Sequence, residues 1–276
     1  MKKILQIGNG IAFVSVVFIN YLSNTGLLNN TTIGEISKDV NSLFTPAGYA
    51  FSIWGLIYLL LLGFAIWGLI YLLLLGFAIY QGRSLFVKVR NDDFVLETGP
   101  WFILSCIFNC AWIFSWIYEY TGLSCIFIFL LLFSLLKIVW KNKMELWDAP
   151  FPVILFLWWP FVIYSGWVTV ASIANVSSYL VKIEWNGFGI SPEIWTLIMI
   201  IIATAINLII TWKRNMREFG MVGAWALIAI GVANNGDNLL IAYTAFTTAA
   251  ILIISSSIHG FKNRHTNPFK KMMQKK

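Results

Sequence analysis

Residues 47–80 read AGYAFSIWGLIYLLLLGFAIWGLIYLLLLGFAIY, an uninterrupted run of 34 residues without a charged side chain. A transmembrane helix needs about 20 apolar residues, so this stretch predicts a helix inside a lipid bilayer. The whole chain agrees, because 59% of its 276 residues are hydrophobic and 11% are charged. An ordinary soluble domain has roughly 25% charged residues. A soluble enzyme, a nucleic-acid-binding protein and a disordered regulator do not fit this composition.

The same stretch contains an exact tandem repeat, in which residues 54–66 recur unchanged as residues 67–79. As one helix, residues 47–80 would be about 51 Å long, whereas the hydrocarbon core of a bilayer is about 30 Å thick. Without one copy of the repeat the helix would measure about 32 Å. We therefore interpret the repeat as a recent or engineered duplication, and we expect one overlong helix that tilts, bends or protrudes.

Seven further apolar stretches bring the number of predicted spans to eight. They cover residues 4–22, 101–118, 123–139, 153–174, 194–212, 220–233 and 239–258. We expect the first to be an uncleaved helix, because no small-residue cleavage site follows it. The predicted fold is therefore an all-α, polytopic membrane bundle of about eight helices.

The positive charges are distributed unevenly over the predicted loops. Seventeen of the 19 Lys and Arg residues lie at the N-terminus or in segments 83–90, 137–143, 213–217 and 262–276. Eight spans place all of these on one side of the membrane. Only Lys38 and Lys182 lie on the other side. The positive-inside rule makes the first side, with both termini, cytoplasmic. We expect a multi-pass integral membrane protein, which in a bacterium would lie in the plasma (inner) membrane.

Few residues could carry covalent chemistry or hold a metal ion. Ionisable groups inside a membrane are the default functional candidates, yet Lys137, at a helix end, is the one Asp, Glu, Lys, Arg or His in the predicted spans. The cysteines and histidines lack zinc-site spacing; they are Cys106, Cys110, Cys125, His259 and His265. The sequence therefore predicts no catalytic residue, no metal site and no bound cofactor.

Tryptophan is the conspicuous residue type, with 14 copies. Six lie near span ends, as an interfacial belt requires; they are Trp101, Trp140, Trp147, Trp185, Trp195 and Trp212. Six others cluster in three spans; they are Trp54, Trp112, Trp116, Trp158, Trp159 and Trp167. Asn109 shares a helix face with Trp112, and Asn175 lies close to the face of Trp167. These amides either hydrogen-bond another helix or offer a polar handle to a ligand between aromatic rings.

Three segments, in the right order, resemble the tryptophan-rich sensory protein family, which includes TspO and the mitochondrial translocator protein (the peripheral benzodiazepine receptor). Residues 46–58 (PAGYAFSIWGLIY) are similar to the family's entry to its second helix. Residues 109–112 (NCAW) are similar to an Asn-x-x-Trp motif of its third helix. Residues 167–175 (WVTVASIAN) are similar to a Trp-x-x-x-Ala-x-x-x-Asn motif of its fifth helix.

The resemblance covers residues 1–175 and implies a five-helix bundle that holds porphyrins, haem-like tetrapyrroles, sterols or benzodiazepine-type ligands. It implies that the loop at residues 23–45 closes the pocket. Residues 176–258 would then add three transmembrane helices, and residues 259–276 a basic cytoplasmic tail. By carry-over from the family, the residues that line or border the pocket are Trp54, Asn109, Trp112, Trp167 and Ala171.

The function expected from this resemblance is a sensory or regulatory receptor that performs no covalent chemistry. One alternative is a transporter of a tetrapyrrole or another small hydrophobic molecule. The other is an enzyme that degrades porphyrin in light. The expected partners are membrane lipid and a hydrophobic small molecule, with a homodimer left open and nucleic acid excluded.

Overall fold

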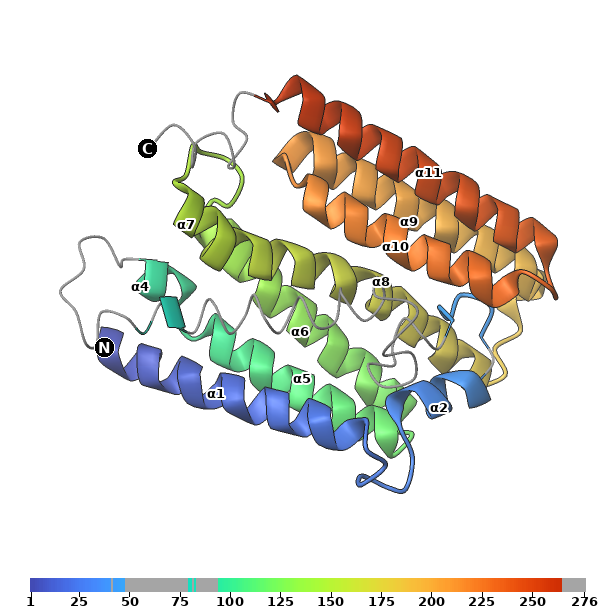
Figure 1. Cartoon of the computed structure of the whole chain (residues 1–276). Coiled ribbons are helices and arrows are strands. Elements are labelled where there is room, and N and C mark those ends of the chain that lie inside the picture. Colours follow the sequence, from blue (N-terminus) through green and yellow to red (C-terminus); the bar gives the residue numbers. More distant parts are fainter. Residues whose placement is uncertain (41, 48–78, 81, 83–93, 265–276) are drawn as a thin grey trace.

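The computed structural model describes residues 1–40, 42–47, 79, 80, 82 and 94–264, and this part of the chain is helical with no strand. Two groups of long helices lie side by side (Figure 1). The first holds α1 (Lys2–Ser23), α5 (Trp101–Ile117), α6 (Thr121–Lys141) and α8 (Trp159–Lys182). The second holds α9 (Pro192–Arg214), α10 (Arg217–Asn234) and α11 (Leu239–Lys262). Helix α10 packs against α8 and so joins the two groups.

The long helices confirm the predicted membrane bundle. Five of them in the described residues are long and apolar enough to cross a bilayer: α1, α6, the stretch Phe151–Lys182 that includes α8, α9 and α11. The apolar α5 is shorter, at 17 residues, and α10 has 18. The remaining predicted span, residues 47–80, lies almost wholly outside the described residues, as does the repeat at 54–79. Short helices on either side of it, α2 (Ile33–Asp39) and α4 (Phe94–Thr98), lie at opposite ends of the bundle (Figure 1).

One predicted boundary is wrong, because the span placed at 153–174 continues as helix to Lys182. Asn175 does not end the helix, since its side chain is 3% exposed and hydrogen-bonded inside the bundle. The start of this stretch is also irregular. After the short α7 (Phe151–Val153), the turn Ile154–Trp158 widens to a π-helix just before Pro160. Proline has no N–H to donate, which explains the wider turn in physical terms.

Small residues let α10 lie close to its three neighbours. An added Cβ at Gly223 would fall on the side chain of Asn207 in α9, and one at Gly231 would lie 2.6 Å from Phe246 in α11. One at Gly166 of α8 would lie 3.3 Å from the backbone of α10. Close approach through small residues is how membrane helices gain packing energy. The alanines of α11 at this contact are Ala242, Ala245 and Ala249, all buried.

The loop between α1 and the undescribed span touches both helix groups. Its helix α2 begins with a capping box, in which Thr32 and Glu35 satisfy each other's backbone N–H groups. The indole N–H of Trp116 in α5 donates to the carbonyl of Ile33 at 3.3 Å. Further along, the Asn234 amide of α10 donates to the carbonyl of Leu43 at 3.1 Å. The loop therefore crosses from α5 to α10 at one end of the bundle.

Candidate functional site

Asn109 forms a polar connection between three helices in the interior of the first group. Its side chain is 2% exposed. Its carbonyl oxygen accepts a hydrogen bond of 2.9 Å from the amide of Asn20 in α1. Its own amide donates to the hydroxyl of Tyr164, in α8, at 2.7 Å. In lipid an unpaired polar group is costly, so these bonds favour one arrangement of α1, α5 and α8.

Trp112 and Asn175 form a second connection, one turn further along α5. The indole N–H of Trp112 donates to the Asn175 side-chain oxygen at 2.7 Å. The Asn175 amide donates to the hydroxyl of Ser124 in α6 at 2.8 Å and contacts the sulfur of Cys125 at 3.1 Å. Both amides singled out in the sequence therefore bond to other helices, which is the first of the two alternatives considered for them.

The residues carried over from the family motifs are buried or half-buried where the structure describes them. Asn109 and Trp112 are buried and bonded to α8, Trp167 is buried on α8, and Ala171 is half-buried on the same helix. Trp54 lies outside the described residues. Their role in binding a ligand stays a prediction, because the residues that would complete the predicted pocket include the undescribed span.

A large apolar cavity lies on the other side of α8. Its volume is about 790 Å³, and it is bounded by α6, α8, α9 and the loop that precedes the undescribed span. The larger hydrophobic side chains around it are Leu43, Phe129, Ile173, Val176, Leu180, Trp185, Trp195 and Met199. No charged side chain is among the described residues that line it.

Helix geometry separates this cavity from the predicted residues. Trp167, Ala171 and Asn175 follow one another at intervals of four residues and therefore share one face of α8. The cavity residues Val176 and Leu180 share a different face, turned toward α9. The same helix thus turns Asn175 toward α5 and α6, and a mostly apolar face that includes Ser172 and Ser177 toward the cavity.

The predicted closing loop borders this cavity. Ser42 and Leu43 line it, and Leu43 is fixed by the hydrogen bond from Asn234. The next contact is the backbone N–H of Ala47, which donates to the carbonyl of Ala229 in α10 at 3.1 Å. The end of this loop therefore borders a cavity that is shared with α9 rather than enclosed by the first helix group, and its closing of a ligand pocket stays a prediction.

Two tryptophans assigned to the interfacial belt also line the cavity. Trp185 and Trp195 are half-buried, with ring centroids 5.3 Å apart. The indole N–H of Trp195 donates to the carbonyl of Gly187 at 2.8 Å, which fixes the ring beside the turn between α8 and α9. One feature of the sequence could have indicated this cavity wall. Three aromatic residues, Trp185, Phe188 and Trp195, lie within eleven positions in the segment that joins two predicted spans. Three other tryptophans assigned to the belt, Trp140, Trp147 and Trp212, are exposed, and the belt itself stays a prediction.

Comparison with known proteins gives one match. A family described as TSPO-like protein matches residues 6–66 and 62–258 of the chain. The two matched segments meet inside the tandem repeat, and the second extends through α9, α10 and almost all of α11. No curated protein and no solved structure matches the chain.

Proposed function

The chain belongs to the TSPO-like protein family, and from this premise we propose that it is a membrane receptor for a planar apolar ligand of the porphyrin, tetrapyrrole or sterol kind. The role that fits such a protein is sensory or regulatory, because binding alone requires no catalytic group. The membrane-spanning helices and the family are established. The ligand and the role are the proposal.

The observation that carries the proposal is the cavity between α8 and α9. Pockets for small molecules have volumes of about 300–1,000 Å³ and are mostly apolar, with a few polar groups that fix orientation. The cavity, at about 790 Å³, falls in this range. Trp185 and Trp195 offer flat faces suited to stacking on a planar ring. Ser177 offers a hydroxyl group, and the hydroxyls of Ser172 and Thr196, which donate to carbonyls of their own helices, can still accept a hydrogen bond.

The resemblance suggests a second location for the same ligand, among Trp54, Asn109, Trp112, Trp167 and Ala171. The described members of this set already use their polar groups within the protein. A ligand there would contact mainly ring faces and the undescribed span. The cavity beside α9 needs no such rearrangement, so we place the ligand there.

Filling the cavity should weaken ligand binding. We expect the substitution Val176→Trp to reduce the affinity for protoporphyrin IX at least tenfold, because the indole would occupy the space that the ring needs. The affinity can be measured from the absorbance change of the porphyrin on titration with the purified protein in lipid nanodiscs. Val14→Trp is the matched control, since Val14 is exposed on α1, and it should bind like the unchanged chain.

The same titration separates the two locations. Trp112→Phe removes the hydrogen bond to Asn175 without filling the cavity, and we expect it to bind porphyrin like the unchanged chain. If Trp112→Phe loses binding and Val176→Trp keeps it, the ligand lies in the first helix group and the cavity assignment is wrong. If the unchanged chain produces no absorbance change, the proposed function itself is refuted.

Transport and light-dependent degradation both begin with the same binding step. Nothing in the described residues favours either of them over binding alone, so both stay predictions from the resemblance. Equal flux of porphyrin into empty and protein-containing vesicles would exclude transport. Loss of the pigment at the same rate when Trp54 and Trp167 are both replaced would exclude a photochemical role for these two side chains.

A further inference from the structure

Trp212 joins α9 to α11 on the outside of the bundle, at the end where both helices finish (Figure 1). Its indole N–H donates to the hydroxyl of Ser255 at 2.8 Å. The ring of His259 meets it edge to face, with the centroids 5.2 Å apart. Ser255 and His259 lie four residues apart and so share one face of α11. The indole is therefore held in one orientation, although 44% of the residue is exposed.

The same ring positions a positive charge at the surface. Lys262 follows His259 by three residues and lies on the same face of α11. Its Nζ is 5.2 Å from the centroid of the Trp212 ring, which is within the range of a cation–π interaction. A group that is already held in place loses less conformational freedom when a ligand binds. Lys262 is thus a preorganised cation between the ends of α9 and α11.

The protein does not neutralise the positive charge at these two helix ends. Four cations lie within two residues of Trp212 or Lys262 in the sequence; they are Lys213, Arg214, Lys262 and Arg264. In the part of the chain that the structure describes, none of the four forms an ion pair with a carboxylate. Residues 238–276 contain six Lys or Arg residues and no Asp or Glu. The last helix therefore brings positive charge to this place without a counter-charge of its own.

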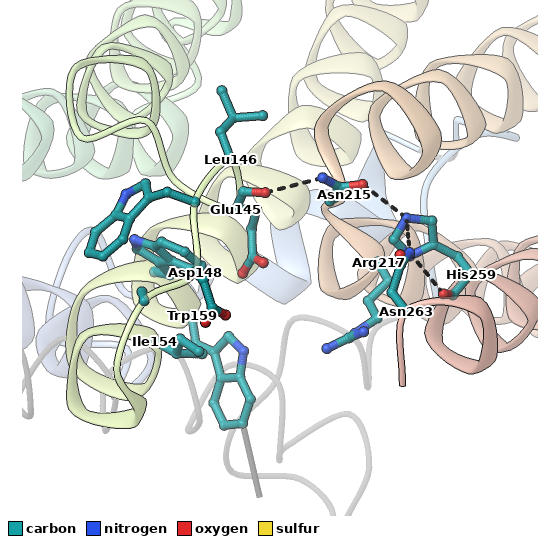
Figure 2. A pocket seen from close by; sticks show the side chains of 12 residues that line it. Glu145, Leu146, Asp148, Ile154, Trp159, Asn215, Arg217, His259 and Asn263 are labelled. Atoms are coloured by element: carbon teal, nitrogen blue, oxygen red, sulfur yellow. Dashed lines mark hydrogen bonds between the residues drawn. The ribbon is translucent and has the colours of Figure 1, made fainter. Parts of the chain in front are cut away.

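The carboxylates at this end of the bundle lie around Arg217 instead. Figure 2 shows Glu145, Asp148 and Arg217 around a polar cavity of about 250 Å³, with His259 on its α11 side. Glu218 is paired with Arg217, whose Nε lies 3.1 Å from a carboxylate oxygen. The charged groups that act on Glu145 are Glu218 and Arg217. The cations beside Trp212 are not part of this group, so their charge is left for an anion from outside the chain.

The surface next to these cations is apolar and exposed. On α11, Ile251, Ile254 and Ile258 precede Lys262 by eleven, eight and four residues, which places them on its face of the helix. On α9, Ile202 and Ile209 precede Trp212 by ten and three residues and share its face in the same way. All five isoleucines are exposed. In a membrane bundle such a surface contacts acyl chains, and a soluble anion gains nothing from it.

We propose that the ends of α9 and α11 bind an anionic phospholipid, such as phosphatidylglycerol. Its phosphate would lie beside Lys262, and an acyl chain would lie along the isoleucines. Clusters of Lys and Arg at the end of a transmembrane helix attract anionic headgroups, and an indole ring suits the depth at which headgroups begin. The site is at the other end of α9 from the apolar cavity, so it does not depend on the ligand proposed there.

Native mass spectrometry of the full chain in detergent, titrated with phosphatidylglycerol, tests the site. We expect tighter binding of phosphatidylglycerol than of phosphatidylcholine with the same acyl chains. Lys262→Gln should weaken the binding of phosphatidylglycerol about fivefold, the effect of one cation near an anionic headgroup. Lys262→Arg keeps both the charge and the stacking on Trp212, and it should bind like the unchanged chain.

Lys141→Gln is the matched control, because it removes one exposed lysine from the end of α6 and changes the net charge equally. It should bind like the unchanged chain. Lys262 is itself exposed, so Lys262→Gln should fold, and without lipid its melting temperature should match that of the control. Equal losses of affinity in Lys262→Gln and Lys141→Gln would overturn the proposal, because net charge alone would then attract the lipid. Displacement of the lipid by inorganic phosphate would also overturn it, since the occupant would be a soluble anion.

Discussion

Replacing Gly223 with leucine is expected to destabilise the second helix group by about 3 kcal/mol or more, which would abolish its folding in most detergents. A Cβ at this position would coincide with the side chain of Asn207. Asn207 is 1% exposed and its amide is bonded to the carbonyl of Ala203 in its own helix, so it has no free space to move into. Overpacking a tightly packed interior costs about 1–3 kcal/mol even for smaller changes. An added Cβ at Gly220, one turn away, would likewise clash with the side chains of Thr211 in α9 and Ser256 in α11.

The measurement is the loss of helical circular dichroism on heating or on titration with sodium dodecyl sulfate. Gly10→Leu is the matched control, because a Cβ at Gly10 of α1 would meet no atom within 4 Å. Leucine is also a better helix former than glycine by roughly 1 kcal/mol, so the control should be neutral or more stable. Equal stability of the two variants would show that α9 and α10 are not in close contact.

The bundle could be predicted from the sequence because lipid imposes a simple rule on the chain. Each span must be a long apolar run, and the ends of α1, α5, α6, α9, α10 and α11 follow these runs within four residues. The end of α8 could not be predicted in this way. Its continuation past Asn175 depends on Trp112 and Ser124, which are 63 and 51 residues away, and a hydropathy pattern contains no information on such partners.

The two candidate sites differ in how much the sequence could show. Asn109 and Trp112 were recognisable because an amide beside an indole in an apolar span is unusual, although their partners were not. The cavity beside α9 was not recognisable, since Val176 and Leu180 are ordinary residues for a membrane helix. A cavity depends on how far apart two helices lie, and that distance is set here by the contacts that α10 makes with both α8 and α9.

Asn109→Leu is expected to cost about 2 kcal/mol of unfolding free energy, because it removes both interhelical hydrogen bonds at once. Bonds of this kind are worth about 0.6–2 kcal/mol each. Asn20 would keep its bond to the carbonyl of Val16, whereas the hydroxyl of Tyr164 would lose the donor that it has at 2.7 Å. Most of the lost unfolding free energy should therefore come from the unpaired Tyr164 hydroxyl on α8.

A double-mutant cycle with Tyr164→Phe tests this explanation. Once Asn109 is leucine, removing the Tyr164 hydroxyl removes an unsatisfied buried group, so the second substitution should cost less than it does alone. Ser105→Ala is the control on α5, because its hydroxyl donates to the carbonyl of Phe102 within the same helix. Strict additivity in the cycle would contradict a structural role for the Asn109–Tyr164 bond. A selective loss of porphyrin affinity with unchanged stability would instead place Asn109 at the ligand, as the family motif implies.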